Sequence, residues 1–326
     1  MSPNPKSIAQ SKVHSAFWRN RKKPQGDSPH LEEKMISTYK YKPLIYFSTT
    51  FLVSFAFFFI GASASFQEDE SGRYVWFLLA GLIAPFLIAL VMVLASNNSN
   101  LKKNFINRLV NPRLIQPKML PVFILLMPLS VLVSIVLSLP LGGSVSQFQI
   151  TEAFSFSTGF VPVLLLFVLA ACFEELGWRG YAFDSLETRY SYLKASIIFS
   201  VLWSFWHLPL IFVKDSYQYE IFQENIWFAV NFFASIIPMG VIVSWVCLKN
   251  RKSVLAAILF HFIINISQEM FAITQMTKCI ETVVLTVVAI AIIASDKELF
   301  FSKKHLARTV GLRAEVLAIS LIMPRL

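Results

Sequence analysis

The chain has 326 residues, 56% of them hydrophobic, and its mean hydropathy is +0.60. Because soluble domains are only about 45–50% apolar, this composition excludes an ordinary soluble domain and indicates an integral membrane protein. The formal net charge of +10 does not indicate nucleic-acid binding, since the basic residues gather in short connections between apolar segments, as they do in cytoplasmic loops. We therefore expect membrane lipid, and no nucleic acid, among its partners.

Eight apolar segments organise the chain between a polar N-terminal arm, residues 1–42, and a basic tail, residues 295–326. Each segment is close to the ~20 residues that a bilayer requires. The predicted spans are Pro43–Phe66, Tyr74–Ala95, Met119–Leu141, Phe160–Phe183, Ala195–Val213, Ile226–Leu248, Val254–Phe271 and Cys279–Ala294. The predicted fold class is all-α, a polytopic membrane protein with about eight transmembrane helices over residues 43–294. The tail mixes basic and apolar residues, a pattern typical of an amphipathic segment on the membrane surface.

The charges of the connections predict the orientation. The connections at Lys102–Lys118 and Lys249–Lys252 are basic, whereas those at Glu68–Glu70 and Lys214–Glu224 are acidic or mixed. With eight spans, every basic connection and both termini fall on one side, which the positive-inside rule places in the cytoplasm. We therefore predict a multi-pass protein of the plasma (inner) membrane with both termini cytoplasmic.

Two adjacent carboxylates, Glu174 and Glu175, interrupt one apolar segment, and Arg179 follows four residues after the second. Charges inside an apolar span are costly and usually have a function. Residues four apart lie one above the other on a helix, so Glu175 and Arg179 are expected to pair. Glu174 is rotated by about 100° from its neighbour and stays available for chemistry. Two like groups in different environments acquire different roles.

Two of the five histidines, His207 and His261, also lie in predicted spans. Pro209, just after His207, is expected to disturb the helix and free a carbonyl. Asn265 follows His261 by four residues, so both side chains lie on one helix face. At about 1.5 Å per residue, Glu174 and the two histidines lie roughly 12 to 18 Å from the cytoplasmic ends of their helices. We therefore expect them to converge in one layer.

Each polar residue also has a structural explanation. A single intramembrane histidine can simply bond a neighbouring helix, and Glu175 with Arg179 fits structural support better than catalysis. Glu269 shares the face of Asn265 but lies nearer the outer surface, so we expect little from it. Three tryptophans either line a cavity or anchor to the membrane interface: Trp178, Trp203 and Trp206. The complete set of polar residues, not any one member, favours a reactive site.

Three motifs carry a resemblance to a known family: Glu174-Glu175-x-x-x-Arg179, Trp203-x-x-x-His207 and His261-x-x-x-Asn265. On these residues the sequence resembles the CPBP family, the CAAX proteases and the bacteriocin-processing enzymes also called Abi proteins. The aromatic that opens the middle motif is often Phe in that family and is Trp here. The resembling core covers about residues 160–271.

The resemblance implies an intramembrane endopeptidase whose helices enclose a cavity that faces the cytoplasm. Glu174 would be the general base, assisted by His207. His261 and Asn265 would polarise the scissile carbonyl, while Glu175 and Arg179 would support the site. The implied substrate is a membrane-associated peptide or lipidated protein: a CAAX-type prenylated protein, a leader peptide or a membrane regulator.

A metal site is the main alternative chemistry. Glu174, His207 and His261 could form a zinc site with an open position, as in some zinc proteases. The sequence contains no His-Glu-x-x-His motif, and the resemblance implies a metal-independent reaction, so we predict no cofactor and keep zinc as the alternative. A cysteine mechanism is disfavoured because Cys172 and Glu174, two residues apart on a helix, point to different faces.

Two other classes of function stay open. A membrane immunity factor or scaffold could use the same polar cluster to bind a partner, but it would not need an oxyanion pair. A transporter could use the glutamate to carry protons, but paired discontinuous helices and repeated halves are not evident. The sequence does not identify the natural substrate, the need for prenylation or the oligomeric state.

Overall fold

The computed structural model describes residues 39–67, 72–151 and 163–301. Within these ranges the chain is helical, with an isolated β-bridge between Ile150 and Phe271 and no strand. The predicted N-terminal arm lies outside the described residues up to residue 38, and so does the predicted amphipathic tail from residue 302 onward.

All eight predicted apolar segments contain a helix. These helices are α3 (Pro43–Ser65), α4 (Tyr74–Leu94), α6 (Leu120–Ser138), α7 (Val163–Gly177), α9 (Tyr192–Trp206), α11 (Ile226–Lys249), α12 (Val254–Met270) and α13 (Gln275–Ser295). Among the described residues, six stretches are long and apolar enough to cross a membrane, where α6 and α9 are counted with their flanking 3-10 turns, and α12 is a shorter apolar helix. The protein is therefore a polytopic all-α membrane protein, as predicted.

The connections hold more structure than their charge suggested. The segments expected as loops contain α5 (Ser99–Val110), α8 (Phe183–Glu187), α10 (Tyr217–Glu224) and α14 (Lys297–Phe301), together with short 3-10 turns. In α5, Leu101, Phe105 and Arg108 are buried at helical spacing. The interpretation of Lys102–Lys118 as a plain basic connection was therefore incomplete, because its apolar residues cover the end of the bundle.

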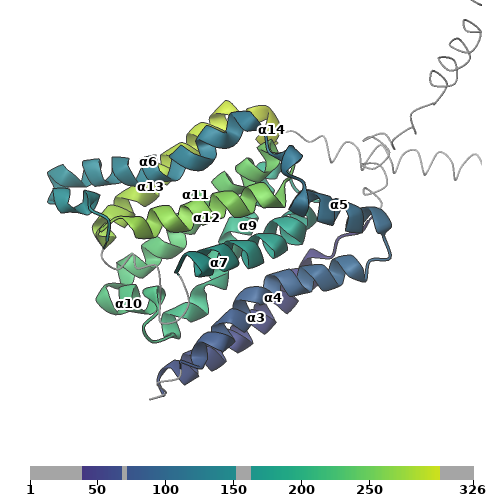
Figure 1. The fold of residues 1–326 in the computed structure, drawn as a ribbon, viewed down its shortest axis with the longest axis horizontal. Coiled ribbons are helices and arrows are strands. Elements are labelled where there is room, and N and C mark those ends of the chain that lie inside the picture. Colours follow the sequence, from purple (N-terminus) through teal and green to yellow (C-terminus); the bar gives the residue numbers. More distant parts are fainter. Residues whose placement is uncertain (1–38, 68–71, 152–162, 302–326) are drawn as a thin grey trace, which may run out of the picture. The chain divides into compact units, whose positions relative to one another are not determined.

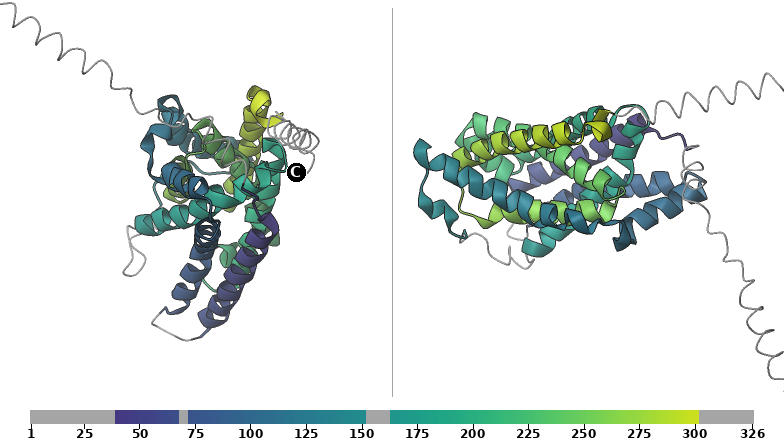
Figure 2. Two further views of the ribbon diagram at one scale, coloured as in Figure 1. Left: turned by 90° about the vertical axis from the view of Figure 1, so that its right-hand side faces the viewer. Right: turned by 90° about the horizontal axis from the view of Figure 1, so that it is seen from above.

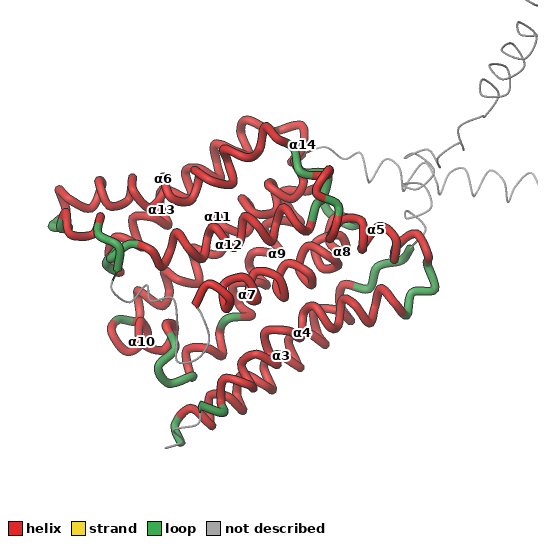
Figure 3. The backbone as a smooth tube through the Cα atoms, viewed as in Figure 1, coloured by secondary structure: helices red, strands yellow, loops and turns green. Residues whose placement is uncertain are grey.

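The long helices form a bundle with a pair of helices along each edge. In Figure 1, α3 and α4 lie along one edge, α6 and α13 lie along the opposite edge, and α7, α9, α11 and α12 fill the centre. The further views in Figure 2 show the long helices side by side along one direction. Short loops join α11 to α12 and α12 to α13, whereas the connections that hold α5, α8 and α10 are longer (Figure 3). The helices that carry the three motifs, α7, α9 and α12, are therefore all central.

A close contact fixes the end of α7 against α4. Pro85 lacks an N–H and leaves the Gly81 carbonyl without its helical donor, and the Ser54 hydroxyl of α3 donates to that carbonyl at 2.8 Å. The Tyr46 hydroxyl donates to the Pro85 carbonyl at 3.1 Å. A Cβ on Gly177 would lie 2.5 Å from the Pro85 carbonyl carbon. The two backbones thus touch directly after the paired glutamates.

Small residues bring α9 equally close to α11. A Cβ on Gly240 of α11 would lie 2.2 Å from the Ser200 hydroxyl oxygen. One turn further along α9, the Ser204 hydroxyl donates to the Phe233 carbonyl at 2.8 Å. Small residues and hydroxyls of this kind hold membrane helices together. They fix the end of α9, where His207 lies.

Candidate active site

The paired glutamates lie where α7 widens into a π-helix, Trp178–Ala182. Single π turns inside helices occur frequently at functional sites. Glu175 and Arg179 are fully buried, and the Arg179 Nη1 lies 2.8 Å from the Glu175 Oε1. The pairing predicted from their spacing is therefore confirmed. The guanidinium also lies 4.4 Å from the centre of the Phe199 ring, which supports it within the bundle.

Glu175 has a second partner that its position in the sequence did not reveal. The His261 Nδ1 donates to the same Oε1 at 3.0 Å. One carboxylate therefore joins Arg179 of the π-helix to His261 of α12. The bond connects residues 86 positions apart, so no local pattern could have predicted it.

Glu174 points to a different neighbour, as the rotation between the two glutamates predicts. The Trp203 indole N–H donates to the Glu174 Oε2 at 2.7 Å. The Trp203 ring also meets the His261 ring edge-on, with centroids 5.5 Å apart. Trp203, Trp178 and Trp206 are all buried in the bundle. The interpretation of these tryptophans as interfacial anchors was therefore wrong.

His207 ends α9, and Pro209 explains its geometry. The helix tightens before the proline, so the His207 N–H donates to the Ser204 carbonyl at 3.1 Å. The Trp203 carbonyl is left for the His207 side chain, whose Nδ1 lies 2.8 Å away. Because a carbonyl only accepts, Nδ1 must carry the proton, and the Nε2 of neutral His207 keeps its lone pair. The proline itself removes the donor for the Phe205 carbonyl, four residues before it, so the carbonyl that orients the imidazole is a different one, left free by the tightening of the helix at His207.

The charged and polar residues of the three motifs gather in one region. The Glu174 carboxylate interacts electrostatically with both imidazoles, and the imidazoles interact with each other. Both Nδ1 atoms are occupied by protein oxygens, so both Nε2 atoms remain for a ligand. Asn265 lies one turn after His261 on α12 and is half-buried. Within the described part of the chain, its side chain has no hydrogen-bond partner.

The three side chains of the metal alternative, those of Glu174, His207 and His261, contact other groups of the protein. Among the described residues, no group of three or more His, Cys, Asp or Glu side chains is placed to hold a metal ion. The carboxylate of Glu174 accepts from an indole and both imidazoles are oriented by protein oxygens. Each of the three side chains therefore has a partner that orients it without a metal.

A second buried polar cluster lies behind the π-helix. Arg108 of α5 donates to the Arg179 carbonyl at 2.7 Å and to the Lys252 carbonyl at 2.6 Å, and it pairs with Asp184. The Lys252 ammonium pairs with Glu187 and lies 3.6 Å from Asp184. Burial lowers the pKa of Lys252, but these carboxylates outweigh it and raise that pKa above its ordinary value. Sequence reasoning missed this cluster because its members come from three separate segments.

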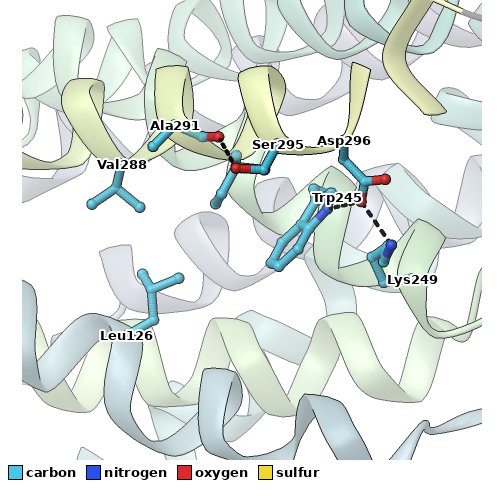
Figure 4. Close-up of a pocket in the computed structure, with 8 residues that line it drawn as sticks. Leu126, Trp245, Lys249, Val288, Ala291, Ser295 and Asp296 are labelled. Atoms are coloured by element: carbon cyan, nitrogen blue, oxygen red, sulfur yellow. Dashed lines mark hydrogen bonds and ion pairs between the residues drawn. The ribbon is translucent and has the colours of Figure 1, made fainter. Parts of the chain in front are cut away.

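A cleft of about 480 Å³ lies away from the motifs, between α6, α11 and α13 (Figure 4). Its walls are formed by Leu126, Trp245, Lys249, Val288, Ala291, Ile292, Ser295 and Asp296. At its polar end, Asp296 pairs with Lys249 at 2.7 Å and accepts from the Trp245 indole at 2.9 Å. No motif residue lines the cleft, so it is separate from the candidate active site.

The chain is thus an all-α membrane bundle whose central helices carry an acid and two oriented imidazoles. Residues 156–267 match the family model described as Rce1-like, type II CAAX prenyl endopeptidase. The curated CAAX prenyl protease 2 of Methanococcus maripaludis (strain S2 / LL) is 60% identical over 269 residues, which are 82% of this chain and 99% of that protein. The chain therefore belongs to the Rce1-like CAAX prenyl endopeptidase family and is a membrane protease. The resemblance carried by the three motifs is confirmed.

Proposed function

We propose that this protease hydrolyses a peptide bond in a CAAX-type prenylated tail, using water activated by Glu174 and His207. The observation that carries the proposal is the orientation of the two imidazoles. Each has its Nδ1 occupied by a protein oxygen, and each is within electrostatic range of the Glu174 carboxylate. Among the described residues, neither Nε2 atom has a hydrogen-bond partner. The printed names of the family and of the archaeal relative support the choice of substrate.

Glu174 is the general base in this mechanism. Its carboxylate takes a proton from water, and the Trp203 indole N–H keeps it oriented. The Nε2 lone pair of neutral His207 accepts the second water proton as a hydrogen bond and aligns the nucleophile. The hydroxide adds to the scissile carbonyl carbon. When the C–N bond breaks, Glu174 passes its proton to the departing amine.

His261 and Asn265 stabilise the oxyanion. His261 donates Nδ1–H to Glu175, so it needs a second proton on Nε2 to donate to substrate. The anionic Glu175 beside it compensates the charge of that imidazolium. The Asn265 amide is the second donor, and losing one such donor typically costs ~100–1000-fold in rate. Glu175 and Arg179 thus position the oxyanion site without touching the substrate.

The substrate class also fits the location that we propose. A prenyl chain partitions into the bilayer, and the site lies on central helices of a membrane bundle. With both termini cytoplasmic, in the plasma (inner) membrane, a cavity facing the cytoplasm would admit the C-terminal peptide of a cytoplasmic protein. Leader peptides and membrane regulators are the other substrate classes.

We propose that the reaction needs no metal, so treatment with a chelator should leave cleavage unchanged. If a chelator abolished cleavage and zinc restored it, Glu174, His207 and His261 would instead be metal ligands.

Replacement of the proposed base tests this function. We expect Glu174→Gln to reduce cleavage of a prenylated Cys-a-a-X peptide in proteoliposomes by about 100- to 10,000-fold, the range for general acid–base catalysis. The melting temperature should change little, because glutamine retains the shape and an acceptor for Trp203. Glu298→Gln, at an exposed position of α14, makes the same chemical change away from the site and should retain full activity. Unimpaired cleavage by Glu174→Gln would contradict the mechanism, and no cleavage by the wild type would favour a scaffold.

A further inference from the structure

Lys278 is a largely buried cation that the proposed mechanism does not use. Its side chain is 14% exposed, and its Nζ lies 3.7 Å from the Glu269 Oε1 and 4.3 Å from the centre of the Tyr217 ring. The distance to Glu269 exceeds that of a hydrogen bond, and the Glu269 side chain is 50% exposed. The ammonium is therefore mostly removed from solvent, and its ion pair with the half-exposed Glu269 is long; it also interacts electrostatically with the buried carboxylate of Glu281.

The place of Lys278 in its helix is also unfavourable without an anion. It lies in the first turn of α13, where the helix dipole favours negative charge and disfavours a cation. The buried Glu281, three residues further along α13, offsets part of this cost. A carboxylate next to Lys278 would be stabilised by both the ammonium and the positive end of the helix.

Two structural routes connect Lys278 to the candidate active site. Along α12, its partner Glu269 is four residues beyond Asn265 and eight beyond His261, about 6 and 12 Å at 1.5 Å per residue. Across the bundle, the Phe232 ring contacts both the His207 ring and the Tyr217 ring, with centroids 5.8 and 5.9 Å apart. Both routes put the ammonium beyond the oxyanion pair, toward the C-terminal end of α12.

We infer that Lys278 binds the C-terminal carboxylate of the substrate. The inference rests on the proposed function. In a tail that ends in Cys-a-a-X, a cut on the carboxyl side of the cysteine leaves three residues, which span about 10 Å when extended. A scissile carbonyl held by His261 and Asn265 places the end of that tail beside Lys278, where it takes over from Glu269 as the anionic partner. Lys278 thus sets how far from the chain end the protein cuts.

The test compares two prenylated peptides that differ only at the C-terminus, one with a free carboxylate and one with an amide. For the wild type in proteoliposomes, we expect kcat/KM to favour the carboxylate by about 10- to 100-fold, as for one charged hydrogen bond. In Lys278→Gln the ratio should fall to about one, through a higher KM for the carboxylate peptide and an unchanged rate for the amide. Lys278→Arg should restore the preference.

The matched control removes the other member of the pair. Glu269→Gln breaks the same contact between α12 and α13, so a purely structural pair would make both variants behave alike. We expect Glu269→Gln to keep the preference for the carboxylate. A further test uses the wild-type protein and a peptide whose tail is one residue longer. We expect the longer peptide to be cleaved more slowly.

Several results would overturn the inference. The wild type could cleave the carboxylate and amide peptides equally, or Lys278→Gln could keep the preference for the carboxylate. A peptide with a lengthened tail could also be cleaved as fast as one with the three-residue tail. If the wild type cleaves neither peptide, the proposed function fails and this inference fails with it. A protein that cleaves both peptides equally keeps the proposed function and loses only the carboxylate site.

Discussion

At the scale of single residues, the two adjacent glutamates divide their tasks through their directions on α7. Helix geometry predicted both the pairing of Glu175 with Arg179 and a separate environment for Glu174. The bonds that orient the site, from Trp203 to Glu174 and from His261 to Glu175, were not predictable, because their partners are far apart in the chain. The sequence thus identified the candidate residues, whereas the packing of α7, α9 and α12 decides which of them touch.

Glu175→Gln should lower both stability and activity. The change removes the charge that pairs with the buried Arg179 and His261, and breaking a buried ion pair typically costs about 3–5 kcal/mol. We expect a lower melting temperature in detergent, lower kcat, and the same trend for Arg179→Ala. An unchanged thermal profile in both variants would contradict the structural importance of this pair.

Trp203→Phe should lower kcat. The protein should lose little more stability than the smaller phenylalanine ring itself causes. The substitution removes the indole N–H that orients Glu174, and one hydrogen bond to a charged group is worth about 1.5–3 kcal/mol. Trp178→Phe is the matched control, because the buried Trp178 indole nitrogen has no hydrogen-bond partner among the described residues. Steady-state kinetics and melting curves of both variants would be compared. Equal losses of kcat would show that ring packing, not the N–H, is responsible.

At the scale of elements, the π-helix is held from behind by α5. Arg108 bonds the carbonyl of Arg179 in the π-helix and the carbonyl of Lys252 in the turn before α12. It therefore ties together two of the elements that carry the candidate site. Neither feature was predictable from the sequence, because five residues are too few to distinguish π from α periodicity and because charge alone marked α5 as a loop.

Arg108→Gln should destabilise the protein more than a surface substitution would. It leaves the buried Asp184 carboxylate with only the more distant Lys252, and an uncompensated buried charge costs about 3–5 kcal/mol. Adding Asp184→Asn removes that charge, so the double variant should be more stable than the sum of the single effects predicts. Melting temperatures of the wild type, the two single variants and the double variant form a double-mutant cycle. If the two single effects simply added up in the double variant, direct coupling between Arg108 and Asp184 would be contradicted.

At the scale of the whole molecule, hydropathy was enough to find the membrane helices. Each predicted apolar segment contains a helix, and the starts at Pro43, Tyr74, Ile226 and Val254 agree with the structure. Hydropathy reports only the length and apolar character of a segment, so it could not predict which helices are neighbours. Hydropathy also merged α9 with the 3-10 turn after His207, because both are apolar and a local change of helix type does not alter the hydropathy.

Site-directed labelling tests the predicted orientation. In spheroplasts containing a variant without native cysteines, a membrane-impermeant maleimide should label Gln223→Cys, in the last turn of α10. It should not label Arg113→Cys, between α5 and α6, until the membrane is permeabilised. Both native side chains are exposed, so burial does not confound the comparison. Labelling in the opposite order would invert the topology and place the basic connections outside.

The most direct test of the central claim is the mass of the products formed from a prenylated Cys-a-a-X peptide in heavy-oxygen water. If Glu174 activates water, the wild type will release the intact a-a-X tripeptide and place one solvent oxygen in the new carboxylate of the prenylated fragment. Glu174→Gln will form neither product at a comparable rate. Cleavage without solvent oxygen in the new carboxylate, or equal product from the Glu174→Gln variant, would contradict the account.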